Sequence, residues 1–107
     1  MRRGDLVTVA LPGDFGKPRP ALIIQSDYFD ATATVTFLTL SSTLTDAAHG
    51  RVTVYATQEN GLRMTSQIMV DKAMTIRREK VGPVIGHVDN ATMLEVNRAV
   101  ALFFGLA

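Results

Sequence analysis

The pattern of hydrophobic and polar positions divides the chain into many short strands and one terminal helix. Short apolar runs, and alternation of apolar with polar residues, are typical of strands. These patterns predict strands at residues 5–10, 21–24, 34–40, 51–55, 66–70, 74–76 and 84–87. Turn-forming pairs such as Asn60-Gly61 and Gly82-Pro83 separate several of them. Most of the chain is therefore predicted to form a sheet of short strands.

The last segment has the period of a helix. Apolar residues recur there at intervals of three and four, at Met93, Val96, Val100 and Phe103. Asp89 or Asn90 is a suitable N-cap, and Gly105 stands where the C′ residue is expected. We predict one amphipathic helix of about four turns, packed on the sheet. The fold class is then mainly β with a C-terminal helix (α+β), and the strands form a small, strongly bent antiparallel sheet or barrel.

Composition narrows the classes of function. With 107 residues, the chain is predicted to be a single domain, residues 1–107. The formal net charge is +1, so contact with a nucleic acid must come from local clusters of basic residues. The absence of cysteine excludes disulfides, thiolate metal sites and cysteine nucleophiles. The first apolar run is too short for a signal peptide, and no run is long enough to span a membrane, so we expect a cytoplasmic protein.

The residue that first suggests a function is Arg19, which lies between Pro18 and Pro20 just before the most apolar strand. Each proline restricts its own φ, and Pro20 also keeps Arg19 extended. The guanidinium is thereby held at the start of a strand that is predicted to be buried on both faces. A planar cation with five donors is suited to bind a phosphate or a carboxylate. The alternative is an ordinary surface arginine in an ion pair.

Three hydroxyl residues, Ser41, Ser42 and Thr43, follow the strand at residues 34–40. If this strand is the antiparallel neighbour of the strand that follows Arg19, its end lies beside Arg19. A guanidinium and several hydroxyls can then bind an anion and stabilise the extra charge on a phosphorane. RNA carries its own nucleophile, the 2′-OH, so cleaving it needs little beyond orientation, a proton acceptor and charge stabilisation. Ordinary turn hydrogen bonding is the alternative for these hydroxyls.

The sequence offers little for other kinds of site. His49 and His87 have no partner at metal-ligand spacing, so neither a metal site nor a cofactor is predicted. The two histidines could act as an acid–base pair if the fold brings them together. There is no glycine-rich phosphate loop and no nucleophile elbow, which argues against phosphotransfer from nucleotides and against triad hydrolysis.

Charged residues in the second half give further candidates. Asp71 follows three apolar residues and can orient a site, accept a proton or stabilise a turn. Arg77 and Arg78 belong to a short basic run that is either a solvated face or a contact to the RNA backbone.

Four stretches in order along the chain carry a family resemblance: Arg3-Gly4-Asp5-Leu6-Val7, then Arg19-Pro20-Ala21-Leu22-Ile23-Ile24, then Ser66-Gln67-Ile68 with Asp71 and Thr75-Ile76, and Gly86 with the ending Phe104-Gly105-Leu106. Together they resemble the MazF/PemK (Kid) toxins of bacterial type II toxin–antitoxin systems. The resemblance implies an SH3-like β-barrel with a C-terminal helix, of the MazF/CcdB type, that forms a homodimer. The implied activity is metal-independent, sequence-selective cleavage of single-stranded RNA by 2′-OH attack. A cognate antitoxin protein would block it.

The same resemblance assigns roles by position. The family's catalytic arginine falls on Arg19, and its catalytic threonine falls on Ser41, with Ser42 or Thr43 as alternatives. An aspartate that takes part in catalysis in some members corresponds to Asp71. RNA contacts are expected from Lys17, Ser42, Thr43, Arg77 and Arg78. The loop at residues 12–18 is shorter than in the family and lacks the Glu and Gln usually found there.

A second class of toxin gives the alternative function. CcdB toxins share this fold but bind DNA gyrase and cleave nothing. The ending at residues 100–107 is similar to a CcdB terminus, although Phe104 replaces the expected tryptophan. CcdB also lacks the Arg-Pro pair at the head of the second strand, which favours the ribonuclease.

Overall fold

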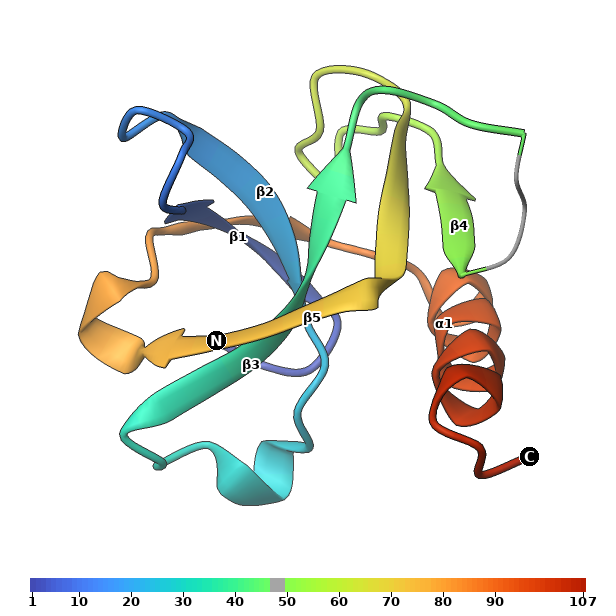
Figure 1. The fold of residues 1–107 in the computed structure, drawn as a ribbon. Helices are drawn as coiled ribbons and strands as arrows, with labels where there is room; N and C mark the ends of the chain where they lie inside the picture. The colour runs from blue at the N-terminus through green and yellow to red at the C-terminus, as the bar shows by residue number, and fades with distance from the viewer. Residues whose placement is uncertain (47–49) are drawn as a thin grey trace.

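The computed structural model describes residues 1–46 and 50–107 and shows a curled antiparallel sheet with a helix beside it (Figure 1). Its strands are β1 (Asp5–Ala10), β2 (Pro18–Ile23), β3 (Thr34–Ser41), β4 (Arg51–Val54), β5 (Ser66–Arg77) and β6 (Val84–His87). The helix α1 spans Asn90–Phe103, and two single 3-10 turns, η1 and η2, span Asp27–Phe29 and Arg78–Lys80. The predicted fold class, mainly β with a C-terminal helix, is confirmed.

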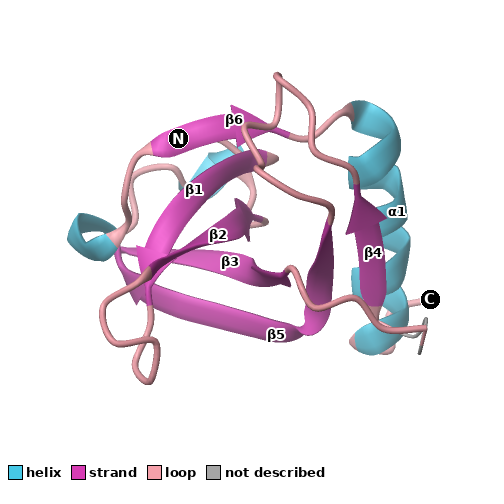
Figure 2. Cartoon of the chain, turned by 90° about the horizontal axis from the view of Figure 1, so that it is seen from above, coloured by secondary structure: helices cyan, strands magenta, loops and turns pink. Residues whose placement is uncertain are grey.

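The strands are ordered β4-β5-β3-β2-β1-β6, and each neighbouring pair is antiparallel. Figure 2 shows how the sheet curls around its own interior, with α1 standing beside β4. The edge strand β6 meets the segment between β4 and β5, where the N–H of His87 donates to the carbonyl of Glu59 at 3.0 Å. The strongly bent sheet predicted from many short strands is the arrangement observed.

The central strands β1, β2 and β3 are buried on both faces. On one face, Leu6, Leu22 and Leu38 are aligned across the three strands and fully buried. On the other face, Ala21 and Phe37 are fully buried within a second hydrophobic cluster. Burying aliphatic or aromatic side chains of this kind contributes about 1.5–3 kcal/mol each. The apolar run of β2 is therefore a core strand, as predicted, and it gives the residues before it a rigid base.

The strand β5 differs from the prediction. Two strands were expected, at residues 66–70 and 74–76, but one strand of 12 residues runs through both. It bends in the middle (Figure 1), where its register with β3 shifts between Leu38 and Leu40. The exposed pair Asp71-Lys72 lies at this bulge. Polar residues that suggested the end of a strand instead occupy a bulge, which bends the strand and lets the ladder continue.

The helix α1 has the predicted caps. Asp89 is the N-cap, and its Oδ1 accepts a hydrogen bond from the N–H of Thr92 at 2.8 Å. After Phe103 the chain turns back at Gly105, whose φ of +74° suits a residue without a side chain. The N–H of Leu106 then donates to the carbonyl of Ala101 at 2.7 Å, closing the end of the helix.

The face that α1 buries is shorter than predicted. The helix packs against β4 and β5, with Val96 fully buried and Met93 and Val100 partly buried. Phe103, predicted to lie on this face, is 54% exposed, because the contacts of the helix with the core end at Val100. No helix of the described residues is long and apolar enough to cross a membrane.

Candidate functional site

Strand β2 begins and strand β3 ends at the same end of their ladder. Ala21 pairs with Thr39, which is the last pair of the β2–β3 ladder toward this end. Arg19 lies two residues beyond that pair on β2 and Ser41 two residues beyond it on β3, where the two strands diverge (Figure 1). Residues two apart on a strand project to the same face, so Arg19 is on the face of Ala21 and Ser41 on the face of Thr39. The antiparallel pairing of β2 with β3 is confirmed, and a shared site of Arg19 and the hydroxyl cluster stays a prediction. The side chains of Arg19 and Ser41 are not hydrogen-bonded to each other.

The guanidinium of Arg19 is half-exposed, and its Nε lies 3.5 Å from Oδ2 of Asp14. Asp14 belongs to the β1–β2 loop, residues 11–17, which is closed by a 2.9 Å hydrogen bond from the N–H of Lys17 to the carbonyl of Asp14. Because the carboxylate meets Nε, the two terminal amino groups of Arg19 remain available to a phosphate. An ion pair this exposed contributes about 0–1 kcal/mol, so a phosphate can replace it.

The β1–β2 loop places further groups beside Arg19. Gly13, Phe15 and Gly16 all have positive φ, which glycine adopts freely and phenylalanine only with strain. The ring of Phe15 is fully exposed, and Lys17 is exposed at the end of the loop. A cation and an aromatic ring therefore lie in solvent next to the candidate phosphate-binding group.

The hydroxyls after β3 are not equivalent. Ser41 Oγ accepts a hydrogen bond from the N–H of Thr43 at 3.1 Å and donates to the carbonyl of Thr43 at 3.3 Å. Turn hydrogen bonding, the alternative considered for the cluster, thus describes Ser41. Ser42 and Thr43 are exposed, and their hydroxyls have no partner among the described residues. These two are the hydroxyls most accessible to a ligand.

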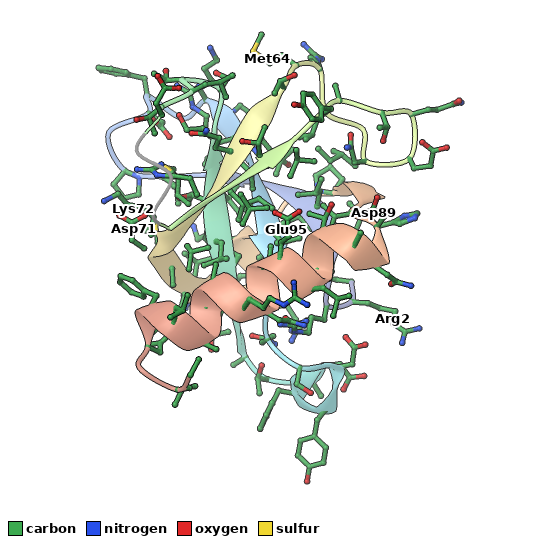
Figure 3. The ribbon with its side chains drawn as sticks, turned by 90° about the vertical axis from the view of Figure 1, so that its right-hand side faces the viewer. Arg2, Met64, Asp71, Lys72, Asp89 and Glu95 are labelled. Carbon is green, nitrogen blue, oxygen red and sulfur yellow. The ribbon has the colours of Figure 1, made fainter. Side chains whose placement is uncertain are left out.

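Asp71 lies in a different place. Its Oδ2 is 3.3 Å from Nζ of Lys72, and it lines an open groove of about 710 Å³ between β4, the bend of β5 and α1. Figure 3 shows Asp71 and Lys72 on the side of the C-terminal half of α1. Arg51, Glu95 and Arg98 line the same groove. The structure does not bring Asp71 into contact with Arg19 or with the hydroxyls.

The electrostatic environment keeps Asp71 ionised. Partial desolvation acts to raise the pKa of Asp71, but the hydrogen bond from Lys72, a backbone N–H and the charges of Lys72 and Arg51 outweigh it and lower the pKa below its usual value. A carboxylate of lowered pKa is a weaker proton acceptor near neutral pH. The surroundings of Asp71 therefore favour an electrostatic role for its negative charge over a role as a proton acceptor.

Arg77 and Arg78 lie at the opposite end of β3. Arg77 pairs with Thr34 and forms an ion pair with Glu79 at 3.3 Å. Arg78 Nε donates to the carbonyl of Thr32 at 2.7 Å. Thr34 is five residues before Thr39, the partner of Ala21, so the position of Arg77 and the last pair near Arg19 are roughly 17 Å apart along β3.

The remaining candidates are the two histidines and any cluster of side chains that could bind a metal ion. His87 ends β6, opposite Asp5 of β1. His49 lies outside the described residues, so the histidine pair is not described. Within the described residues, no three or more histidine, cysteine, aspartate or glutamate side chains come together as a metal site would require.

Comparison with known proteins identifies the family. The model of the PemK-like, MazF-like toxins of type II toxin–antitoxin systems matches residues 2–104. The chain belongs to this family. It is also 42% identical, over 108 residues, to a protein described as a probable endoribonuclease MazF from Mycolicibacterium smegmatis (strain ATCC 700084 / mc(2)155). That match covers 100% of this MazF-like toxin and 99% of the relative.

Solved structures share the fold of this MazF-like toxin. An endoribonuclease in complex with its cognate antitoxin, from a mycobacterial species, superimposes with a TM-score of 0.85 at 24% identity, covering 100% of this chain and 97% of that one. The Mycobacterium tuberculosis toxin MazF-mt6 gives a TM-score of 0.83 at 24% identity, with 96% and 98% covered. A MazE–MazF complex from Deinococcus radiodurans gives 0.77 at 17% identity, with 100% and 98% covered.

Two side chains of the candidate site, Asp14 and Gln67, were not anticipated from the sequence of this MazF-like toxin. Asp14 was assigned to a turn, and Gln67 was noted only as part of a family motif. Asp14 pairs with Arg19 because the short β1–β2 loop folds back on β2. Gln67 is a buried polar residue next to the apolar Ile68, and that position was the available signal.

Proposed function

We propose that this MazF-like toxin cleaves single-stranded RNA at selected sequences without a metal ion, using the 2′-OH of the RNA as the nucleophile. The broader activity follows from its family and its 42% identical relative: the chain is a MazF-type endoribonuclease toxin. The observation that supports the finer proposal is that β2 begins and β3 ends at the same end of their ladder. Arg19 is half-exposed there, and the hydroxyls of Ser42 and Thr43 have no partner among the described residues.

The proposed reaction is a transesterification. The 2′-oxygen forms a bond to phosphorus while the bond from phosphorus to the 5′-oxygen breaks. The 2′-OH gives its proton to an acceptor, the departing 5′-oxygen receives one, and the products are a 2′,3′-cyclic phosphate and a 5′-hydroxyl. Negative charge builds up on the non-bridging oxygens in the transition state, and donors fixed beside them stabilise it more than the ground state.

In this proposal, Arg19 stabilises the phosphorane through its terminal amino groups. Ser41 holds the turn that follows β3, and the hydroxyls of Ser42 and Thr43 donate to phosphate or base oxygens. Lys17 contacts the backbone of the RNA next to the scissile phosphate. Each of these groups lies at the end of the sheet where β2 begins and β3 ends.

Asp71 enters the proposal as the third catalytic residue, acting from the groove beside α1. A strand of RNA that passes both Arg19 and Asp71 would cross the end of β3. Asp71→Asn keeps the shape of the side chain and removes its charge. We expect it to lower the cleavage rate of a long RNA more than that of a dinucleotide, which cannot reach the groove. Equal rates for Asp71→Asn and the wild type on the long RNA would remove Asp71 from the reaction.

Arg77 and Arg78 are proposed to contact RNA backbone far from the scissile phosphate.

For partners, we propose a cognate antitoxin, as in the solved complexes of relatives, and a second copy of the chain. Exposed apolar side chains at the end of α1 are the feature that supports a protein partner: Leu102, Phe103, Phe104 and Leu106. Light scattering of the purified protein measures the homodimer directly. We also propose that the protein is cytoplasmic, because mRNA and the antitoxin are found in that compartment.

The experiment that tests the function is cleavage of a mixed RNA pool in the presence of EDTA, followed by mapping of the ends. We expect 2′,3′-cyclic phosphate ends at one recurring short sequence. Cleavage that EDTA abolishes, or 3′-hydroxyl ends, would overturn the mechanism. A supercoiling assay with DNA gyrase tests the CcdB-type alternative, for which inhibition without RNA cleavage would be decisive.

A further inference from the structure

Gln67 of β5 makes an unusual set of hydrogen bonds. Its side chain is almost completely buried, with 6% of the residue exposed. Its Oε1 accepts from the N–H of Thr45 at 3.1 Å, and its Nε2 donates to the carbonyl of Thr45 at 3.1 Å. Nε2 also lies 3.4 Å from Oγ1 of Thr53 on β4. One amide group thus bonds both backbone groups of a single residue, as a neighbouring strand would.

The position of this amide relates it to the segment that follows β3. We call residues 41–45 the hydroxyl loop. At its first residue, Ser41 pairs with Gln67 in the β3–β5 ladder. At its last residue, Thr45 is bonded to the side chain of the same Gln67. Both ends of the hydroxyl loop are therefore held by one residue, and the exposed Ser42 and Thr43 lie between them.

We propose that Gln67 is a positioning residue for RNA cleavage, which holds the hydroxyl loop in the conformation that presents Ser42 and Thr43 to the RNA. The inference rests on the proposed function, because it assigns a role within the same site. Gln67 does not touch the substrate. It acts by fixing donors whose placement must be accurate to a fraction of an ångström for the transition state to be stabilised.

The chemistry of an amide explains why glutamine suits this position. Thr45 offers one donor and one acceptor, and the amide offers the complementary acceptor and donor with the spacing of a backbone peptide. A glutamate has the same shape but, when ionised, has two acceptors and no donor. It can keep the bond from the N–H of Thr45 but opposes the carbonyl of Thr45. A protonated glutamate regains one donor and can make both bonds.

This difference gives a test in which pH restores the interaction. In Gln67→Glu, we expect kcat at neutral pH to fall about 10- to 100-fold, the loss that a displacement of about 1 Å causes, with KM changed less. Burial raises the pKa of a carboxyl group above its usual value of about 4.3. The ratio of wild-type kcat to Gln67→Glu kcat should therefore decrease as pH is lowered toward that pKa. A ratio that stays constant with pH would overturn the proposal.

A second variant separates the effect of Gln67 on the order of the hydroxyl loop from its effect on catalysis. Gln67→Leu keeps an apolar side chain of similar size in the core and removes both bonds to Thr45. We expect faster amide hydrogen exchange at Thr45 together with the loss of kcat. The matched control is Thr53→Val, which removes the third hydrogen bond of Gln67 and leaves both bonds to Thr45. It should change neither exchange at Thr45 nor kcat.

The outcomes distinguish this inference from the function on which it rests. Faster amide hydrogen exchange at Thr45 with unchanged kcat would show that Gln67 only stabilises the structure, and this would overturn the positioning role. Unchanged amide hydrogen exchange at Thr45 in Gln67→Leu would show that Gln67 does not hold the hydroxyl loop at Thr45. If Gln67→Leu does not fold, the pH profile of Gln67→Glu decides alone. Wild-type cleavage by an Arg19→Ala protein would instead overturn the proposed site, whatever the Gln67 variants show.

Discussion

Replacing Arg19 by alanine should separate the stability of this toxin from its activity. The variant keeps the core residues of β2, which lie after Arg19 and are fully buried. The interaction lost is the 3.5 Å ion pair with Asp14, in which the Arg19 side chain is 42% exposed. Exposed pairs contribute about 0.2–1 kcal/mol, and solvent screening at this exposure favours the lower part of that range. Since 1 kcal/mol shifts Tm by roughly 4–8 °C in a domain of this size, the change in Tm should be a few degrees at most.

The expected loss of activity is much larger. Removing one preorganised donor to the charge that develops in a transition state costs about 2.7–4 kcal/mol, or 10²- to 10³-fold in kcat. Arg19 is a charged donor with two free terminal amino groups, so the loss should reach at least this range. A change of at most about 1 kcal/mol in the free energy of unfolding leaves nearly all molecules folded and cannot produce such a loss.

The assay is single-turnover cleavage of a short single-stranded RNA that contains the mapped site, measured with thermal unfolding on the same samples. Arg2→Ala is the matched control, because it also removes an arginine from an exposed ion pair, with Asp27 at 3.2 Å. The control should cleave at the wild-type rate. Arg19→Lys keeps the charge but loses the planar fork and should remain slow. Wild-type cleavage by folded Arg19→Ala would refute the assignment, and wild-type cleavage by Arg19→Lys would refute the need for two donors.

Two further predictions follow from the carboxylates. Asp14→Asn removes the charge that competes with RNA for Arg19, so the Kd for a non-cleavable RNA should fall about two- to fivefold at low salt, with little change in stability. Fluorescence anisotropy measures this Kd, and weaker binding would show that Asp14 instead orients Arg19 for the RNA. The backbone N–H of Arg3 and the side chain of Arg2 lower the pKa of Asp27 below its usual value, so its ionised form is favoured in the folded state. Its contribution to stability is therefore present above about pH 4 and is lost as pH falls through the lowered pKa. Urea unfolding should show wild type more stable than Asp27→Asn at pH 7 and the difference shrinking at pH 3; a difference that grows on acidification would contradict this sign.

The sequence was most informative where local chemistry decides the structure. The apolar run in β2 predicted a strand buried on both faces, and Asp89 and Gly105 predicted the two ends of α1, because strand burial and helix caps depend on residues close in sequence. β5 was less predictable. Its polar pair Asp71-Lys72 suggested a turn, but β5 pairs with β3 both before and after this pair, so the strand continues through a bulge. Such long-range pairing has no local signal.

The same distinction applies to the candidate site. The antiparallel pairing of β2 with β3 could be predicted because strands that follow each other in sequence are often neighbours in a sheet. Gln67 could not, since its contact with Thr45 depends on the register between β3 and β5, which are distant in sequence. Arg77 is basic like Arg19, but β5 runs antiparallel to β3, so Arg77 lies opposite Thr34 at the start of β3, whereas Arg19 lies at its end. It follows that Arg77 cannot contact a phosphate bound by Arg19 and can act only on a distant part of the same RNA strand.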